Sequence, residues 1–495
     1  MEKDRKEGLV SGSGMTRRRF LRDLGLGAAV CAIPACARRD AGPAAIEKPN
    51  VLFIAVDDLN DWSSVLRGHP QAVTPNLERL AERSVTFTRA YTAAAACNPC
   101  RTALMTGQPP YRTGIYENWV PWRDYLPEAV TIPQYFTKNG YFSSGAGKIY
   151  HNTFPDPASW EDYFPSRENH FPPYIMPESR PVNMPHHPDM YKAFDWWGHD
   201  RPDEETGDFQ SVRWVSERLH QAPGRPFFLA CGLYRPHLPW FVPKKYFDMF
   251  PLESIRLPEV LENDLDDVPA GGVALAHRQK VKYHDPVIEH DKWKEAVRAY
   301  LASIAYADAM LGRLLDALDS CPCRDNTIIV LWSDHGWQLG EKTHWRKYAL
   351  WENIARVHFM ISSPRGAAGL PEGSRAGARC SRAVSLQDIY PTLIELCGLP
   401  PRRDIAGHSL VPLLRDPERS WPHPAVTSVF TGELAVSWDK WRYIRYADGG
   451  EELYDLDSDP NEWTNLAGRA EFDDTRRRMA AMLPENPAPP VKKKQ

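Results

Sequence analysis

Residues 50–58 of the chain read Asn-Val-Leu-Phe-Ile-Ala-Val-Asp-Asp. Six consecutive apolar residues bounded by polar ones are typical of a strand buried on both faces, as in a parallel sheet covered by helices. Two further apolar runs, at residues 226–231 and 326–332, have the same character, and the second is followed by Ser-Asp-His-Gly. The three runs predict the central strands of a mostly parallel sheet.

Helical patterns separate these predicted strands. Thr74-Pro75 predicts the start of one helix, Thr131 to Pro133 the start of another, and residues 292–318 form a long amphipathic pattern. Helices that alternate with buried strands are typical of a doubly wound α/β domain. We therefore expect a large sheet with helices on both of its faces.

The pattern changes near residue 422. From there, short alternating runs predict a small antiparallel sheet over residues 425–430, 433–438, 441–446 and 452–456. We expect four parts along the chain: a signal and linker over residues 1–47, a catalytic domain over 48–420, a small-sheet subdomain over 421–485, and a disordered Pro- and Lys-rich tail over 486–495.

The composition is that of a globular protein. Of the 495 residues, 42% are hydrophobic and 25% are charged, which excludes a disordered or collagen-like chain. The 60 Lys and Arg residues against 64 Asp and Glu residues give a net charge of −4. A dedicated nucleic-acid-binding protein would carry a strongly basic domain, so we expect no nucleic acid as a partner.

The N-terminal segment has the pattern of an export signal. Arg17-Arg18 resembles a twin-arginine signal and precedes an apolar run over residues 24–35, which is shorter than the roughly 20 residues that span a bilayer. Ile33 to Cys36 resembles a bacterial lipobox, with plain cleavage as the alternative. We expect an exported, periplasmic bacterial protein whose only membrane attachment is a lipid on Cys36.

Charged side chains follow two of the predicted strands. Asp57 and Asp58 come directly after the first strand, and Asp334 and His335 come after the last one. Ligands of open α/β sheets bind beyond the carboxyl ends of the strands. Three carboxylates and an imidazole there predict a divalent cation, with calcium or magnesium favoured by the oxygen ligands. Helix caps or turns are the structural alternative for each acidic strand end.

A third segment, residues 97–107, reads Cys-Asn-Pro-Cys-Arg-Thr-Ala-Leu-Met-Thr-Gly. Its proline turn predicts a short helix whose N-terminus, together with Arg101, suits an oxyanion. Cys97 would then be a nucleophile-bearing residue at the edge of an anion site. The spacing of Cys97 and Cys100 also fits a redox pair, a zinc pair or a disulfide, because pairing among the nine cysteines cannot be read from the sequence.

The pattern Cys97-x-Pro99-x-Arg101, followed by Thr106-Gly107, resembles the signature of the type I sulfatases. Other stretches are similar in the same order, so that the likeness covers about residues 48–470: 50–58, 147–151, 235–237, 333–336 and Lys347. His335 and the Arg-Pro-His-Leu-Pro stretch at 235–239 are most similar to the iduronate-2-sulfatase branch. The resemblance implies an alkaline-phosphatase-like α/β sandwich with a smaller C-terminal antiparallel sheet.

The resemblance also implies a mechanism. A maturation enzyme would oxidise Cys97 to formylglycine, whose hydrate attacks sulfur and then releases sulfate. A calcium ion would be held by Asp57, Asp58, Asp334, His335 and the side chain of residue 97. The sulfate oxygens would be bound by Arg101, Lys148 and Lys347, while His151 would act as the base and His237 would protonate the leaving oxygen.

The expected substrate is a sulfated oligo- or polysaccharide, with a 2-O-sulfated uronic acid suggested by the iduronate-2-sulfatase likeness. Two alternatives stay open: a phosphoester or phosphonate hydrolase of the same superfamily, and a non-catalytic binder of sulfated glycans in which Cys97 is unmodified. Four tryptophans in expected loops predict either a platform for sugar stacking or a cap on the core: Trp119, Trp122, Trp196 and Trp197.

Overall fold

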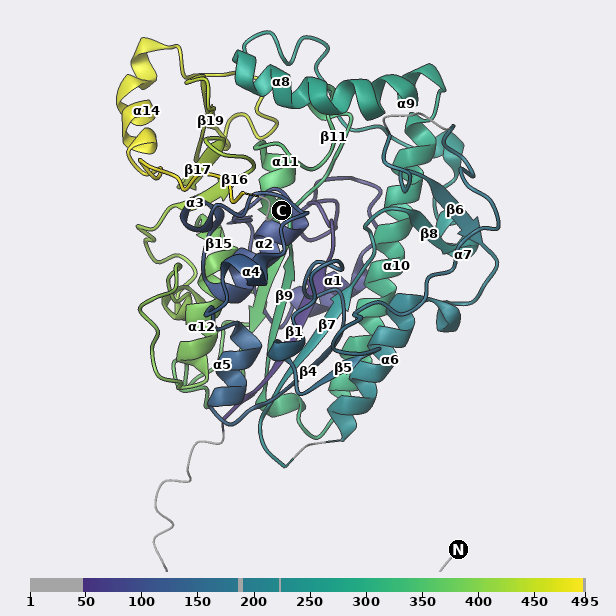
Figure 1. The fold of residues 1–495 in the computed structure, drawn as a ribbon, viewed down its shortest axis with the longest axis vertical. Helices are drawn as coiled ribbons and strands as arrows, with labels where there is room; N and C mark the ends of the chain where they lie inside the picture. The colour runs from purple at the N-terminus through teal and green to yellow at the C-terminus, as the bar shows by residue number, and fades with distance from the viewer. Residues whose placement is uncertain (1–47, 186–189, 222–223, 493–495) are drawn as a thin grey trace, which may run out of the picture. The chain divides into compact units, whose positions relative to one another are not determined.

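A sheet of eight strands runs through the molecule in the order β14-β2-β13-β9-β1-β7-β4-β5 (Figure 1). The computed structural model describes residues 48–185, 190–221 and 224–492, which belong to a single unit. The predicted signal and lipobox lie outside the described residues. Among the described helices, none combines the length and the apolar character that crossing a membrane requires.

The centre of the sheet is parallel. Strand β1 (Asn50–Val56) pairs in parallel with β7 (Phe227–Leu233) on one side and with β9 (Thr327–Ser333) on the other. Strand β4 (Phe142–Gly147) continues the parallel order beyond β7, whereas β13 (Phe359–Ser362) is antiparallel to β9. The three predicted apolar strands are therefore confirmed, and the sheet is mixed but mostly parallel.

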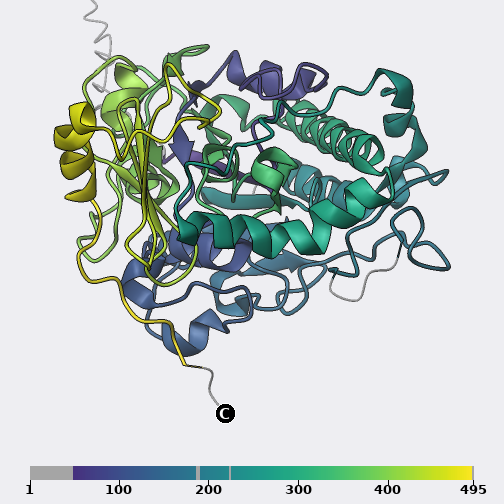
Figure 2. The ribbon, with the colours of Figure 1, turned by 90° about the horizontal axis from the view of Figure 1, so that it is seen from above.

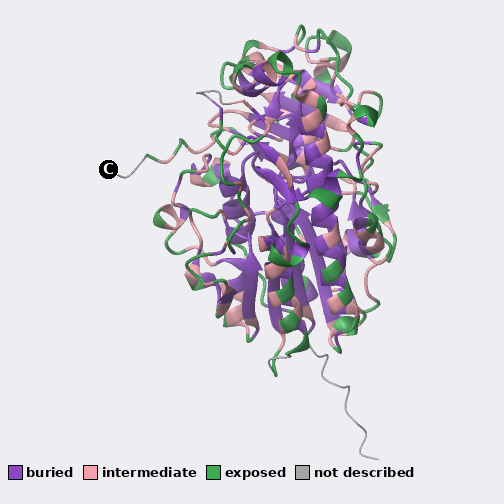
Figure 3. Ribbon diagram, turned by 90° about the vertical axis from the view of Figure 1, so that its right-hand side faces the viewer, coloured by how far each residue is buried: buried purple, intermediate pink, exposed green. Residues whose placement is uncertain are grey.

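The outer strands are short. They are β5 (Asp162–Phe164), β2 (Val85–Phe87) and β14 (Arg379–Cys380). The described parts of the sheet are buried along their length, whereas the helices around them carry exposed residues on their outer sides (Figure 3). This explains why the central strands read as unbroken apolar runs rather than as alternating ones.

Helices cover both faces of the sheet. One face packs against α1 (Pro75–Ala81), α6 (Gly207–His220) and the long α10 (Trp293–Asp319), together with the alternate residues Leu52, Ile54 and Val56 of β1. The other face packs against α2 (Cys97–Thr106), α5 (Ile132–Lys138) and α12 (Ile389–Leu396). The layers are visible in the view from above (Figure 2).

The C-terminal sheet is an antiparallel meander. Its strands are β16 (Ala425–Ser428), β17 (Leu434–Trp438), β18 (Trp441–Arg445) and β19 (Glu451–Asp455), and α14 (Asp473–Ala480) packs on one face. The predicted small sheet is thus confirmed. Its core includes Val436, Tyr443 and Leu453, which alternate with residues of the opposite face, as expected for a two-sided antiparallel sheet.

The described part of the tail is ordered, contrary to the expectation of disorder over residues 486–495. The backbone N–H of Ala488 donates to the Tyr111 carbonyl at 2.8 Å, and that of Val491 donates to the Gly114 carbonyl at 3.0 Å. The Tyr125 hydroxyl donates to the Lys492 carbonyl at 2.5 Å. The Pro-rich composition misled the prediction because an extended segment can be fixed by hydrogen bonds to a neighbouring loop.

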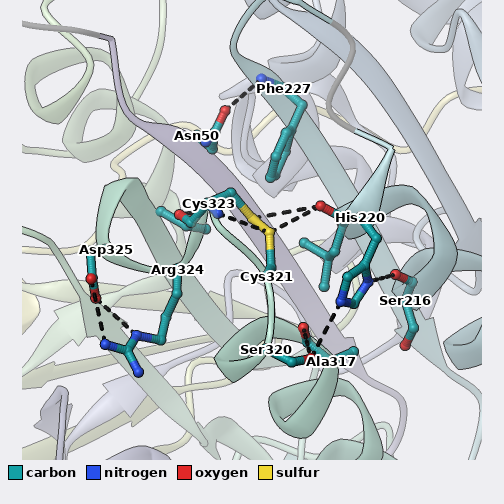
Figure 4. The surroundings of a disulfide bond; sticks show 12 residues. Asn50, Ser216, His220, Phe227, Ala317, Ser320, Cys321, Cys323, Arg324 and Asp325 are labelled. Atoms are coloured by element: carbon teal, nitrogen blue, oxygen red, sulfur yellow. Dashed lines mark hydrogen bonds and ion pairs between the residues drawn. A yellow bond between two sulfur atoms is a disulfide. The ribbon is translucent and has the colours of Figure 1, made fainter.

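One disulfide joins Cys321 and Cys323, in the turn between α10 and β9 (Figure 4). Its Cys321 sulfur lies 3.0 Å from the carbonyl oxygen of Leu219 at the end of α6. The other five cysteines of the described residues are free and buried, and they include Cys97 and Cys100. The alternative of a Cys97–Cys100 disulfide is therefore not what the structure contains.

Candidate active site

The two acidic strand ends meet because β1 and β9 are parallel neighbours in register. Val56 pairs with Ser333, so Asp57 and Asp58 emerge beside Asp334 at the same edge of the sheet. The backbone N–H of Asp58 donates to Asp334 Oδ1 at 3.0 Å. Asp58 has a left-handed φ of 57°, a conformation that non-glycine residues seldom adopt and that is often found at functional sites.

Cys97 is the first residue of α2 and lies at the centre of this group. Its Sγ is 3.3 Å from His335 Nε2, 3.6 Å from Asp58 Oδ1 and 2.8 Å from Lys347 Nζ. Lys148 Nζ is 3.8 Å away from the same sulfur. The structure thus brings Cys97 together with the predicted metal ligands and with both predicted lysines.

Arg101 lies one helical turn further along α2 and is fully buried. Its Nε donates to Asp334 Oδ2 and its Nη2 donates to Asp57 Oδ1, both at 2.9 Å. Its Nη1 donates to the carbonyls of Lys148 at 2.6 Å and Ile149 at 2.9 Å. The donors of Arg101 are therefore occupied by two carboxylates and two backbone carbonyls, so that the guanidinium orients the carboxylates.

The two lysines come from different parts of the fold. Lys148 follows β4, and its Nζ forms an ion pair with Asp57 Oδ2. Lys347 follows the short strand β11 (Trp345–Arg346), and its Nζ donates to Asp58 Oδ1 at 2.9 Å. Burial lowers the pKa of each ammonium, but the adjacent carboxylates outweigh it and raise the pKa, so both lysines are charged.

Two of the three carboxylates, Asp58 and Asp334, have a lowered pKa, whereas burial raises the pKa of Asp57 to about 7. Burial raises the pKa of Asp58, but His237 and Lys347 outweigh it, and the pKa lies below its usual range. For Asp334, burial is likewise outweighed by Arg101, so that its pKa is also well below the usual value. Both groups are therefore ionised, as metal-binding carboxylates must be.

Burial has the opposite consequence for the thiol. It raises the pKa of Cys97 well above its usual value and that of Cys100 to about 12. Reactive and redox-active cysteines have a lowered pKa, because the thiolate is the attacking species. Both side chains are fully buried, so neither the redox pair nor an unmodified Cys97 nucleophile fits this environment.

The donor set fits a divalent cation. Within the described ranges, ligand atoms of Asp58, Cys97, Asp334 and His335 lie within 4.8 Å of one another, and a second such group contains Asp57 and His237 in addition to Asp58 and Cys97. Asp58 Oδ2 is buried without a hydrogen-bond partner. Because an unpaired buried carboxylate oxygen is costly, this atom indicates a missing cationic partner. Cys100 belongs to neither group, which argues against a Cys97–Cys100 zinc pair.

The two predicted histidines face the same centre. His237 Nε2 lies 3.6 Å from Asp58 Oδ2, and its Nδ1–H donates a hydrogen bond to the Leu238 carbonyl at 2.5 Å. His151 Nδ1 is buried without a partner. Burial and the charge of Lys148 lower the pKa of His151 to about 2, so its ring is neutral.

A cavity of about 490 Å³ adjoins this centre, because Lys148 and Lys347, which contact Cys97, also line the cavity. Four predicted catalytic side chains line it: Lys148, His151, His237 and Lys347. The remaining lining includes residues that sequence reasoning missed, namely Asn118, Tyr191, Tyr234, Tyr283, Arg346 and Tyr348. Tyrosine and arginine have no distinguishing local pattern, so only the tertiary arrangement identifies them.

The four tryptophans do not line this cavity. Trp122, in α4 (Trp122–Tyr125), and Trp196, in β6 (Trp196–His199), are buried in the core. Trp197 is half-buried next to Trp196, and Trp119 is 45% exposed. For Trp122 and Trp196 the core interpretation is confirmed, and the aromatic wall of the cavity is made of tyrosines instead.

Comparison with known proteins decides the family. Residues 49–399 match the family model of the sulfatases, and residues 340–488 match that of the C-terminal region of N-sulphoglucosamine sulphohydrolase. The chain belongs to the sulfatase family. A sulfatase of Formosa agariphila is 40% identical over 456 residues, which cover 90% of this chain and 88% of that protein.

Human iduronate 2-sulfatase is 32% identical over 398 residues, with 71% of this chain and 70% of the human protein covered. Among solved structures, the phosphonate monoester hydrolase of Agrobacterium radiobacter matches with a TM-score of 0.68 and 24% identity, over 88% of this chain and 94% of the other. The latter likeness concerns the fold alone. The sequence relatives identify this sulfatase as a sulfuric ester hydrolase with an alkaline-phosphatase-like fold.

Proposed function

We propose that this enzyme hydrolyses sulfate esters of a sulfated carbohydrate, with Cys97 converted to formylglycine and a calcium ion bound beside it. The observation that carries the proposal is the position of Cys97. It lies between a group of ligands suited to a hard divalent cation and two charged lysines at 2.8 and 3.8 Å from its sulfur. An anionic ester that enters the cavity would meet positive charge on both sides of residue 97.

Asp57, Asp58, Asp334 and His335 would hold the cation. Carboxylate oxygens are the preferred ligands of calcium. His335 Nδ1 lies 2.9 Å from the Gly336 carbonyl, which leaves His335 Nε2 free as the remaining ligand. When bound, the cation supplies positive charge that stabilises an anionic oxygen at residue 97. Arg101 would keep Asp57 and Asp334 oriented toward it.

Formylglycine supplies, as its hydrate, an oxygen nucleophile and a second hydroxyl that allows sulfate to leave. Lys148 and Lys347 would bind the sulfate oxygens and hold their charge during the transfer, in a site shielded from water. His151, neutral in this environment, would accept a proton from the second hydroxyl. His237 would carry a proton to the leaving oxygen, with Lys347 beside it.

A sulfated sugar is supported by the name of the human relative, iduronate 2-sulfatase, and by the tyrosine-lined cavity. Aromatic side chains bind the apolar faces of sugar rings. We extend the proposal to a 2-O-sulfated uronic acid as substrate and to a maturation enzyme as a partner. We also propose export through the N-terminal signal to the periplasm, with Cys36 as the site of a lipid anchor.

Two measurements test the proposal. Mass spectrometry of the peptide that contains residue 97 should show a loss of about 18 Da relative to cysteine, from the balance of atoms in thiol oxidation to an aldehyde. An intact thiol in fully active protein would contradict the role of formylglycine, and an intact thiol in inactive protein would favour the glycan binder. A Cys97→Ala variant expressed in parallel is the control.

The second measurement compares 4-nitrophenyl sulfate with 4-nitrophenyl phosphate and phosphonate, followed by defined sulfated disaccharides. We expect kcat/KM to be higher for the sulfate than for either phosphorus ester. A faster phosphorus ester would show that the enzyme is a phosphoester or phosphonate hydrolase on the same fold. Desulfation of a 2-O-sulfated uronate, measured by release of sulfate, tests the finer substrate assignment.

A further inference from the structure

Arg346 lies at the wall of the active-site cavity, directly before Lys347. It ends β11, which forms a two-stranded hairpin with β10 (Gln338–Leu339). Arg346 has φ 72° and Tyr348 has φ 76°, so left-handed residues flank Lys347 on both sides. Such conformations cost free energy in non-glycine residues and persist where the surroundings hold a functional side chain in place. Here the three consecutive side chains all line the cavity.

The guanidinium of Arg346 is held by aromatic rings. Its centre lies 4.8 Å from the ring of Tyr191, 5.0 Å from that of Tyr283 and 5.7 Å from that of Trp337. Its Nη1 donates a hydrogen bond to the Tyr283 hydroxyl. These contacts fix the plane of the guanidinium without neutralising its charge.

Arg346 has no carboxylate partner among the described residues, and its Nε is buried without any hydrogen-bond acceptor. The other cations of the site differ, because Lys148 pairs with Asp57 and Lys347 pairs with Asp58. The described lining of the cavity contains no aspartate or glutamate at all. A partly buried guanidinium with a free N–H edge is costly unless an anion from outside the chain completes it.

Arg346 also lies beside the lysine that would hold the sulfate. Lys347 Nζ is 5.6 Å from the ring of Trp337, the same ring that the Arg346 guanidinium contacts. An anion bound at Arg346 would therefore belong to a substrate whose sulfate ester is already bound at Lys347. The planar fork of an arginine matches a carboxylate or sulfate group and binds it more strongly than a neutral hydroxyl.

We propose that Arg346 is a specificity-determining residue that binds a second anionic group of the substrate, next to the sulfate ester that is hydrolysed. The inference rests on the proposed function and deepens it. The preferred substrates are sugars that carry two neighbouring anionic groups, the second being a carboxylate or a further sulfate. Aryl sulfates lack this group and do not use Arg346.

The test compares Arg346→Ala and Arg346→Lys with the wild-type enzyme on 4-nitrophenyl sulfate and on a 2-O-sulfated uronate disaccharide. We expect Arg346→Ala to lower kcat/KM for the disaccharide by about 10- to 100-fold, the usual worth of a charge-assisted hydrogen bond. The value for the aryl sulfate should stay within about twofold, and Arg346→Lys should recover part of the loss. Arg278→Ala is the matched control, because Arg278 also stacks on an aromatic ring, that of Phe430, but is exposed and lies outside the cavity.

Further substrates distinguish a carboxylate from a sulfate as the second anionic group. If the second anion is a carboxylate, the effect of Arg346→Ala disappears with the carboxyl-reduced disaccharide. If it is a sulfate, the effect disappears with a monosulfated neutral sugar and persists with its disulfated counterpart. An equal loss on aryl sulfate and on every sugar, or no loss on any of them, would overturn the inference.

An inhibition assay tests the role of Arg346 independently of the proposed hydrolysis of sulfated sugars. A uronate disaccharide without sulfate should inhibit wild-type hydrolysis of 4-nitrophenyl sulfate, and Arg346→Ala should raise the inhibition constant about 10-fold or more. This readout needs no turnover of a sulfated sugar. If the wild-type enzyme desulfates no sugar but shows this inhibition, the proposed function fails and the assignment of Arg346 stands. Inhibition that is equal in both enzymes, or absent from both, shows that Arg346 binds no carboxylate, and the assignment is then overturned unless the disulfated sugar shows the loss described above.

Discussion

Replacement of Lys347 by methionine should reduce activity far more than stability explains. The ammonium of Lys347 is 2.8 Å from Cys97 Sγ and 2.9 Å from Asp58 Oδ1, in a position that solvent does not reach. Loss of one preorganised donor to a developing anion typically lowers kcat by about 10²- to 10³-fold, which corresponds to roughly 2.7–4 kcal/mol. We expect a decrease of that size for hydrolysis of 4-nitrophenyl sulfate.

Lys342→Met is the matched control. Lys342 is also buried, lies in the turn between β10 and β11, and forms a 2.6 Å ion pair with Asp264 and a 2.6 Å hydrogen bond to the Glu462 carbonyl. Removing one partner of a buried ion pair costs about 3–5 kcal/mol of unfolding free energy, so both variants should unfold at lower temperature. Only Lys347→Met should lose kcat at a temperature where circular dichroism shows both proteins folded.

Two results would contradict the predicted role of Lys347. If the two variants lose the same fraction of kcat under conditions where both are folded, then Lys347 has no special role in the reaction. If Lys347→Met raises KM and leaves kcat unchanged, the ammonium contributes equally to the bound substrate and to the transition state. The first outcome would remove the lysine from the sulfate-binding residues, and the second would keep it as a binding residue that adds no stabilisation specific to the transition state.

Three other predictions concern the cation, the pH and the tail. Prolonged treatment with a calcium chelator should abolish sulfatase activity, and calcium should restore it. Asp58→Asn should raise the calcium concentration needed for half-maximal activity, because one charged ligand is lost. Full activity of metal-free protein, verified by elemental analysis, would exclude the cation. Burial raises the pKa of Asp388 from 3.8 to about 7, so the protonated carboxyl stabilises the folded state, and this stabilisation is lost as the pH rises from about 4 to 7. Asp388→Asn should reduce the decrease of the unfolding free energy over this pH range by on the order of 2–4 kcal/mol, measured by thermal melts. An unchanged pH dependence would contradict the shift. Deletion of residues 486–495 should lower the melting temperature by a few degrees, through loss of about 1 kcal/mol per hydrogen bond to residues 111–125, and an identical melting curve would show that the tail does not stabilise the fold.

Much of the fold could be predicted because its central strands satisfy local and tertiary preferences at once. The run at residues 50–56 is apolar because both of its faces are covered, and the structure assigns the strand the same bounds. The long helix, expected over residues 292–318, covers Trp293–Asp319. The small C-terminal sheet followed from alternation of apolar and polar residues.

The residues missed by the sequence are those whose roles depend on distant partners. Arg346 is distinguished by a guanidinium that forms no ion pair with any of the described carboxylates and whose Nε has no hydrogen-bond partner, which no local pattern can reveal. Arg101 could be predicted as part of the site, but not that its donors would be occupied by Asp57 and Asp334. The pairing of Cys321 with Cys323 and the ordering of the tail likewise depend on contacts made only after folding.

The burial of Cys97 has a consequence for the order of folding and of the proposed modification. In the folded chain its side chain has 0% exposure, and all ten residues of α2 are buried with it. The proposed maturation enzyme would therefore have to reach this thiol before α2 docks onto the sheet. If the chain folded first, the unmodified thiol would be buried, and the proposed oxidation would require the chain to unfold again.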